Sequence, residues 1–457
     1  MQKSYPYHSK SKVFHWLENS KHYCLIVFFF FLPFTQALTI NIGFPLKISE
    51  LALVCLSALY ILSRLLRENI FISVTSSNVK IISNLFMLFF AIAILSFIIN
   101  SIWSYPYTVF YSDYRFGPHI NSFLKTIYIL IIGLSVFVSL QAFIKNSHTY
   151  INILCWGAIA SGLYSWYLFV FSLNNWPTIL LPGMDDWPQH GLFSFGHFIR
   201  CGTFKEGNYA GLFFCLAFIL SIYIKKYIFS ALIFLSLVPT VSAMGFASIL
   251  LFFMCFCCLY LIKRKKHLYI LLIISIISIL PFFLNTNEDL SFLIAKFIPT
   301  NEVSEYEDAH NSRNERLNLI RIAANIGVDN PIWGVGLSKF GIHLAHYNKS
   351  RKYNIDTTRT YIVNNIYFEI LAELGMPAWI TFLILCWFIL RVSLKDTTGI
   401  ALSGMIVILF YFMAFPTFSV IYVWVFVAFI LSFDEKKTFY KRSLLNSAHN
   451  RSTAIRD

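Results

Sequence analysis

The chain has 457 residues, of which 57% are hydrophobic and only 13% are charged. Soluble domains carry about 25% charged residues, so this composition excludes an ordinary soluble protein and indicates one that spans a membrane. The apolar runs are continuous rather than alternating with polar residues, which predicts an all-α polytopic membrane protein and excludes a membrane β-barrel. The net charge of +14 lies mostly in short connections between these runs, so we interpret it as membrane topology rather than nucleic-acid binding.

Twelve apolar segments are predicted to span the membrane as helices. They are residues 22–40, 46–63, 81–99, 123–144, 149–172, 207–224, 227–241, 243–262, 268–285, 376–394, 398–415 and 417–433. The first segment follows a basic stretch, but it is long and lacks a clear small-x-small cleavage site. We therefore expect a retained span rather than a signal peptide.

Lysine and arginine are unevenly distributed between the two sides of this predicted bundle. With the N-terminus placed in the cytoplasm, the cytoplasmic side holds 22 Lys and Arg and 6 Asp and Glu, against 14 and 16 on the outer side. This asymmetry follows the positive-inside rule and predicts that both termini are cytoplasmic. With eleven or thirteen spans, either the basic segment 262–267 or the basic tail falls on the wrong side.

Two polar segments are consequently predicted to lie outside, residues 173–206 and residues 286–375. Neither is large enough to form an independent soluble domain, so we predict one membrane domain over residues 1–457 with a two-part external cap.

Eight of the nine cysteines fall in apolar runs and Cys201 stands alone in a polar loop. The cysteines therefore indicate neither a disulfide framework nor a metal site.

The smaller external segment ends in "HFIRCGTFKEGNYAGLFF", where polar residues meet the start of a span. It contains Arg200, Glu206 and Asn208. Ionisable groups at a membrane boundary are costly and are candidates for function, although a single one is about as often an interfacial charge. Arg200 together with Arg316 and Arg115 favours the functional interpretation. Guanidinium groups bind phosphate oxygens through paired hydrogen bonds and stay charged at any ordinary pH.

The larger external segment contains "NSRNERLNLIRIAANIG", which predicts a helix over residues 311–327. Ser312 and Glu315 are spaced as a capping box at its start. Gly327 and Pro331 are expected to end it. The following "VDNPIWGVG" is then a turn, in which the glycines let the backbone bend or approach a neighbour closely. A Rossmann loop is excluded because no strand precedes the glycines and the third glycine is missing.

A second external helix is predicted over residues 361–375, "YIVNNIYFEILAELG". One of its faces is apolar, while Asn365, Glu369 and Glu373 recur at spacing i, i+4 on another face. We expect this helix to lie at the outer membrane surface and to be angled into the bundle.

Four motifs follow one another along the outer part of the chain. They are R-x-G-T-F-x-x-x-N from Arg200 to Asn208, R-x-x-x-I-x-x-A from Arg316 to Ala323, "DNPIWGVGLSKF", and "NNIYFEILAELG". In this order, and with about twelve spans and one long external loop, the chain resembles the bacterial O-antigen polymerase and O-antigen ligase superfamily. The motifs cover roughly residues 200–380.

The resemblance implies sugar transfer at the periplasmic face of the bacterial inner membrane. The donor is a glycan on undecaprenyl pyrophosphate. The acceptor is another lipid-linked repeat unit in a polymerase, or the lipid A core in a ligase. No metal or other cofactor is implied, because the pyrophosphate is already a leaving group. The implied partners are the lipid-linked oligosaccharide, membrane lipid and a chain-length regulator protein, and no nucleic acid is expected.

The resemblance assigns Arg200 and Arg316 to the pyrophosphate, where negative charge develops during transfer. Where the family often has His-Asn, this chain has Asn364-Asn365, and an asparagine cannot accept the proton of the acceptor hydroxyl. Glu206, Glu369 and His346 remain candidates for that role. The predicted catalytic residues are Arg200, Arg316, Glu206 and Asn364. The predicted substrate-binding residues are Arg115, Asn208, Asn365, Tyr367, Glu369 and His346.

Polymerisation of repeat units into O-antigen or a related surface polysaccharide is the preferred interpretation, because the divergent polymerase branch tolerates the departure at Asn364 better. A ligase or a protein O-oligosaccharyltransferase remains an alternative. A polysaccharide transporter is disfavoured, because transporters place polar residues at the bilayer midplane and these spans are nearly free of charge away from their ends.

Overall fold

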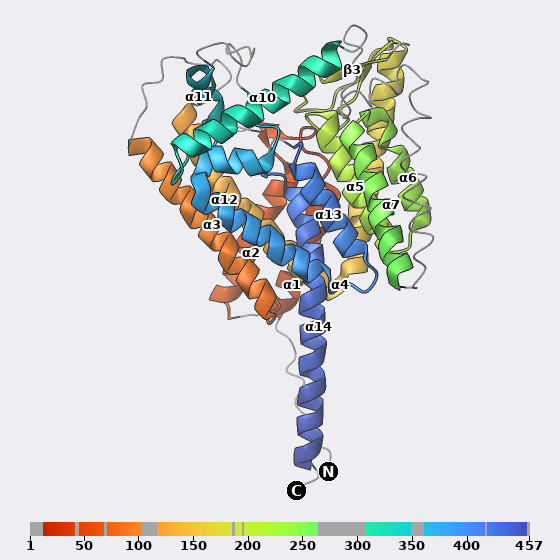
Figure 1. The fold of residues 1–457 in the computed structure, drawn as a ribbon. Helices are drawn as coiled ribbons and strands as arrows, with labels where there is room; N and C mark the ends of the chain where they lie inside the picture. Colours follow the sequence, from red (N-terminus) through yellow and green to blue (C-terminus); the bar gives the residue numbers. More distant parts are fainter. Residues whose placement is uncertain are drawn as a thin grey trace.

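The computed structural model describes residues 12–41, 45–67, 71–102, 117–184, 188–193, 196–263, 307–348, 361–415 and 418–454. Within these residues the chain forms α-helices and two short antiparallel hairpins, which confirms the all-α class (Figure 1). The helices are α1 (Lys12–Phe30), α2 (Ile48–Leu65), α3 (Ser77–Ile102), α4 (Pro118–Leu173), α5 (Gly207–Tyr223), α6 (Tyr227–Leu235), the 3₁₀ turn η1 (Val238–Thr240), α7 (Ala243–Lys263), α10 (Glu307–Asp329), α11 (Phe340–Tyr347), α12 (Ile366–Ser393), α13 (Ile400–Phe412) and α14 (Ile421–Ala454). The strands are β1 (Ile40–Asn41), β2 (Pro45–Leu46), β3 (His190–Phe193) and β4 (Gly196–Ile199).

Four described helices, α2, α3, α4 and α12, are long and apolar enough to cross a membrane, and α5, α6, α7 and α13 are shorter apolar helices. Helix α4 has 56 residues, a length of about 84 Å that exceeds a hydrocarbon core of about 30 Å. Its backbone leaves helical geometry at Asn146, which divides it into two halves that match the predicted spans 123–144 and 149–172. The predicted span 268–285 lies outside the described residues.

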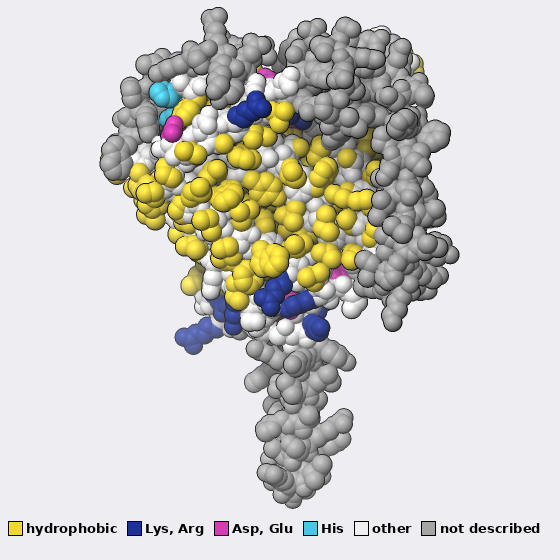
Figure 2. Space-filling view, viewed as in Figure 1, with side chains coloured by type: hydrophobic (Ala, Val, Ile, Leu, Met, Phe, Trp, Pro, Cys, Tyr) yellow, Lys and Arg dark blue, Asp and Glu magenta, His cyan; other side chains and the backbone are white. Residues whose placement is uncertain are grey.

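On the face shown in Figure 2, hydrophobic side chains form a broad band across the middle of the molecule, with lysine and arginine below the band and near its upper edge. Large apolar side chains in this part of the structure are exposed, among them Met87, Leu95 and Leu163. An exposed apolar surface of this extent is a liability in water and is the normal outer surface of a protein in a bilayer. The protein is therefore a membrane protein.

Helix α10 lies across one end of the bundle, and α14 projects from the opposite end (Figure 1). We call α10, α11 and the turn 330–339 between them the cap. The cap packs on the first half of α12 through a small core of its own. That core includes Leu319, Ile322, Phe340, Leu344 and Ala372.

The start and end of α10 differ from the prediction. The helix begins at Glu307, so Ser312 lies inside it and is not its N-cap. Gly327 also lies inside the helix, where a side chain would collide with Leu371 because its Cβ would lie 2.6 Å from Leu371 Cγ. The glycine therefore permits close packing of α10 on α12 rather than ending the helix. The helix ends at Asp329, two residues before Pro331, as the geometry of proline requires.

The second predicted cap helix begins five residues later than expected, at Ile366, and it is continuous with the next span in α12. Asn365 is its N-cap and accepts a hydrogen bond from the Phe368 N–H at 3.2 Å. Gly375 has a φ of 79° and breaks the helix between its cap half and its apolar half. The predicted boundary at Gly375 is thus a kink within one helix.

Candidate active site

The turn after α10 and the kink of α12 form a close backbone contact. Gly334 has a φ of +60°, and a Cβ on it would lie 2.3 Å from the Glu373 carbonyl carbon; a Cβ on Gly375 would lie 2.6 Å from the Ile332 oxygen. Only glycine fits either position. Gly336 N–H donates to the Glu373 carbonyl at 2.8 Å, and Met376 N–H donates to the Pro331 carbonyl at 2.7 Å.

Helix α3 holds the other side of the same turn. The Ser96 hydroxyl donates to the Trp333 carbonyl at 2.6 Å, and the Asn100 side-chain amide donates to the Gly334 carbonyl at 3.4 Å. The "DNPIWGVG" motif therefore joins the end of α10 to α3 and α12. Because α10 carries Arg316, this contact fixes the position of that arginine over the bundle.

A buried charge network lies directly below the turn. Lys125 of α4 binds the Glu369 carboxylate at 2.9 Å and the Glu373 carboxylate at 3.4 Å. Glu373 also accepts a hydrogen bond from Ser338 N–H at 2.9 Å. Buried carboxylates are stable only when they are paired or hydrogen-bonded, so Lys125 secures both acidic residues of α12 beneath the cap.

Lys339 is fully buried beside this network, and its ammonium group donates to the Asn100 carbonyl at 2.9 Å. Burial lowers the pKa of Lys339 to about 8. Its neighbour His343 is also buried, and burial together with the charge of Lys339 lowers the pKa of the imidazole to about 4. The imidazole is therefore neutral at physiological pH.

Arg200 lies where the hairpin of β3 and β4 joins α5. Its Nε donates to the Thr240 carbonyl at 3.1 Å and its Nη2 donates to the Val241 carbonyl at 3.3 Å. Those carbonyls are accessible because the chain leaves helical hydrogen bonding between η1 and α7, with Val241 at a φ of 44°. Nη2 also lies 3.5 Å from the Asn208 side-chain oxygen. Two separate parts of the chain, the turn between η1 and α7 and the first turn of α5, thus hold one guanidinium in place.

Arg200, Arg316 and Glu206 form an electrostatic cluster at this end of the bundle. Burial lowers the pKa of Arg200; Glu206 opposes this shift and Arg316 adds to it. Burial also lowers the pKa of Arg316, and Glu206 is the strongest opposing charge. Both guanidinium groups stay charged because an arginine pKa is far above neutral pH. Glu315 also acts on Arg316, so carboxylates accompany the two arginines. Paired guanidinium groups of this kind are suited to binding phosphate oxygens.

The Tyr209 phenol is within electrostatic range of Glu206 in the arginine cluster and of Glu369 in the lysine network. The two charged regions are therefore neighbours under the cap. Among the described residues, no three His, Cys, Asp or Glu side chains are grouped so that they could hold a metal ion.

Residues 227–383 match the family model described as O-antigen ligase. This stretch, about a third of the chain, is similar to the O-antigen ligase family. The match confirms the resemblance to the O-antigen polymerase and ligase superfamily and associates the protein with membrane glycan processing of that type. No curated protein matches the chain.

The matched stretch contains Arg316, Asn364 and the acidic residues of α12, and Arg200 precedes its first residue. Asn364 is half-buried immediately before α12. The Asn365 amide donates to the Met413 carbonyl at 3.0 Å in addition to capping α12, so both of its polar ends bind protein atoms. With these contacts Asn365 stabilises the start of α12 and links it to the end of α13.

Three other predicted substrate-binding residues lie apart from the arginine cluster or beyond the described chain. The Tyr367 hydroxyl donates to the Leu409 carbonyl at 3.2 Å, inside the bundle. His346 is exposed in the last turn of α11. Arg115 lies outside the described residues. Of that group, Asn208 and Glu369 are the two that lie beside charged residues under the cap.

Lys125 and Lys339 were absent from the predicted site. Lys339 is buried and Lys125 is half-buried, and each binds a residue distant in the sequence. A signal for Lys125 was present, because it is an isolated lysine two residues inside a predicted span. Such a residue needs a partner within the protein.

Proposed function

We propose that the protein polymerises lipid-linked oligosaccharide repeat units by transferring a growing glycan from undecaprenyl pyrophosphate to the sugar of the next unit. The observation that carries this proposal is that Arg200 and Arg316, which come from separate segments, are half-buried and lie within electrostatic range of each other and of Glu206. Two fixed guanidinium groups in a low-dielectric site stabilise the charge of a departing pyrophosphate. The O-antigen ligase family match supports the same chemistry.

In the proposed reaction, an acceptor hydroxyl oxygen forms a bond to the anomeric carbon of the donor glycan. The bond between that carbon and the pyrophosphate oxygen breaks, and its electron pair leaves with the lipid pyrophosphate. Arg200 and Arg316 bind the phosphate oxygens as this charge develops. The acceptor proton passes to a carboxylate.

Glu206 is the proton acceptor that we propose. It is partly exposed and lies in electrostatic range of both arginines. Glu369 is 1% exposed and its charge is paired with Lys125. His346 lies on the exposed side of α11. Of the three candidates, Glu206 alone combines access to solvent with a place beside the proposed phosphate-binding groups.

Incubation of the purified protein with its cognate lipid-linked repeat unit tests the proposal. We expect a ladder of products, each longer by one repeat, when the glycans are separated by electrophoresis. A substrate that stays unchanged with active, folded protein would argue against polymerisation.

The alternative is a ligase that transfers finished polysaccharide to the lipid A core, and the description of the matched family favours it. The glycan of a deletion strain distinguishes the two. Loss of a polymerase leaves a single repeat on the core, whereas loss of a ligase leaves a bare core and polymer stored on the lipid carrier. For either reaction, we propose that the protein lies in the bacterial inner membrane with both termini in the cytoplasm.

A further inference from the structure

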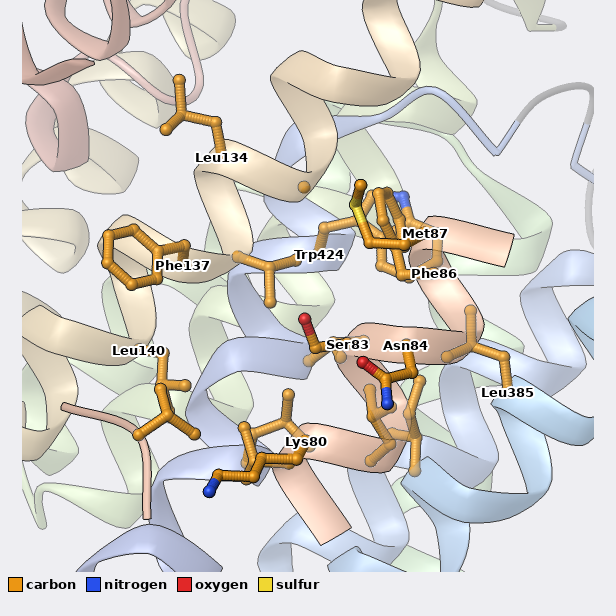
Figure 3. A pocket seen from close by; sticks show the side chains of 18 of the residues that line it. Lys80, Ser83, Asn84, Phe86, Met87, Leu134, Phe137, Leu140, Leu385 and Trp424 are labelled. Atoms are coloured by element: carbon orange, nitrogen blue, oxygen red, sulfur yellow. The ribbon is translucent and has the colours of Figure 1, made fainter. Parts of the chain in front are cut away.

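A second feature of the bundle is an apolar groove between α3, α4, α12 and α14 (Figure 3). Its volume of about 510 Å³ falls in the range of small-molecule and lipid sites, roughly 300–1,000 Å³. Phe86, Phe137, Leu385 and Trp424 are among its walls. The Trp424 indole N–H donates to the Phe418 carbonyl at 2.7 Å, so it does not add a polar group to the groove.

The groove is open to the surface of the bundle that faces lipid. Two of its lining residues, Met87 and Leu130, are 56% and 44% exposed. An apolar chain therefore has a direct path into it from the surrounding bilayer.

One end of the groove is polar and basic. Lys80, Ser83 and Asn84 line it together, and their i, i+3 and i, i+4 spacing places them on one face of α3. All three are exposed. The groove thus changes along α3 from an ammonium, a hydroxyl and an amide to a purely apolar wall.

The acidic side chains at this end of α3 are already engaged. Asp434 binds Lys395 and the Ser76 hydroxyl, and Glu435 accepts the Ser76 N–H at 2.9 Å. Within the described chain no carboxylate forms an ion pair with Lys80. The positive charge at the mouth of the groove is available for an anionic group.

This groove is separate from the arginine cluster. Asn100, at the other end of α3, contacts the turn of the cap, and twenty residues of helix place Lys80 about 30 Å from it along the axis. Lys80 therefore lies at the membrane face opposite the cap.

We propose that the groove binds an anionic glycerophospholipid of the leaflet opposite the cap. The phosphate binds Lys80, the glycerol and ester oxygens meet Ser83 and Asn84, and one acyl chain lies along the apolar walls. The order of polar and apolar groups in the groove matches the order of groups in such a lipid, and the charge at its mouth is opposite to that of the headgroup.

The experiment measures lipid that stays bound to the full-length protein. The protein is extracted from bacterial membranes in mild detergent, delipidated by repeated washing and analysed by native mass spectrometry for bound phosphatidylglycerol-type lipid. Lys80→Glu is expected to lower the bound anionic lipid about fivefold, the effect of one lysine at a membrane surface. Ser83→Trp, which fills the polar end from an exposed position, is expected to lower it as well.

Two controls make the result specific. Lys80→Arg keeps the charge and is expected to retain the lipid. Lys225→Glu removes another exposed lysine, which follows α5 at the end of that helix away from Arg200, and is expected to have no effect. Unchanged anionic lipid in both Lys80→Glu and Ser83→Trp, or a wild-type protein that retains mainly neutral phospholipid or polyprenyl phosphate, would overturn the proposal.

Discussion

At the scale of single residues, the decisive feature is how each charged side chain is held. Arg200 is held by two backbone carbonyls and Arg316 by the helix that crosses the bundle. Among the described residues no acidic side chain forms an ion pair with either arginine, so both are able to bind a ligand anion. Their roles in transfer stay predictions, and variants of individual residues test them.

Arg200→Ala and Arg316→Ala are each expected to lower the rate of glycan transfer about 100- to 1,000-fold, the effect of removing one group that stabilises developing charge. Initial rates with the lipid-linked repeat measure this, with the amount of protein in the membrane determined in parallel. Arg321→Ala is the matched control. Arg321 lies on the same helix, is exposed and contacts Asn318 at 3.3 Å. A normal rate in either test variant removes that arginine from the site.

Glu206→Gln is expected to lower the transfer rate at least about 100-fold, because an amide cannot accept the proton of the acceptor hydroxyl. Gln is nearly isosteric, so binding of the lipid-linked donor is expected to change little. Donor binding measured by fluorescence with a labelled lipid pyrophosphate separates the two effects. Equal losses of binding and rate would show that Glu206 orients the arginines instead of accepting the proton.

Lys339 makes stability depend on pH. Its pKa of about 8 in the folded protein is lower than the ordinary value of 10.5. Between these values the unfolded chain binds more protons than the folded one, so the free energy of unfolding rises with pH in that window. The thermal midpoint of wild type should rise relative to Lys339→Met between pH 8 and 10. A constant difference between the two proteins across this range would contradict the assignment.

At the scale of elements, local sequence patterns predict the helices and packing decides their ends. Apolar runs indicate spans because the cost of burying polar groups in lipid applies to each residue separately. The start of α10 depends instead on contacts with other parts of the chain, so a capping-box pattern at Ser312 did not locate it. Gly327 likewise suggests a helix end from the local sequence, because its actual role, close packing against Leu371, depends on a residue distant in the chain.

Gly375→Ala tests the contact that joins α10 to α12. The substitution places a side chain at a φ of 79° and against the Ile332 carbonyl, at a cost of about 1–3 kcal/mol from backbone strain alone. We expect a lower melting temperature in detergent and a lower transfer rate, because α10 also carries Arg316. Gly399→Ala is the control. Gly399 has a φ of 84°, but its nearest neighbour, Leu259 Cδ1, would lie 3.3 Å from the new Cβ. A loss of stability as large in Gly399→Ala would refute the role of crowding.

At the scale of the whole molecule, the apolar band separates two polar ends with different chemistry. The cap end holds two arginines and a buried network of opposite charges. The other end holds Lys80 at the mouth of the groove. Composition predicts this division, because hydrophobicity and net charge add along the chain. It does not predict that Lys125 binds Glu369, since 244 residues separate them and only the packing of α4 against α12 brings them together.

Lys125 therefore joins α4 to the half of α12 on which the cap packs. Lys125→Met is expected to lower the free energy of unfolding by about 3–5 kcal/mol, because it leaves buried carboxylates without a countercharge. Glu369 and Glu373 differ in the hydrogen bonds that they keep in this variant. Glu373 keeps the Ser338 N–H, whereas Glu369 Oε2 has no hydrogen-bond donor among the described residues.

Glu369→Gln should consequently restore more stability to Lys125→Met than Glu373→Gln does. It neutralises the carboxylate that keeps no hydrogen-bond donor once the lysine is removed. Unfolding of the single and double variants in detergent gives the coupling energies. If the two glutamine substitutions restore the free energy of unfolding equally, Lys125 stabilises both carboxylates to the same extent. If the decreases in the free energy of unfolding of the single variants add up to that of the double variant, Lys125 stabilises neither carboxylate.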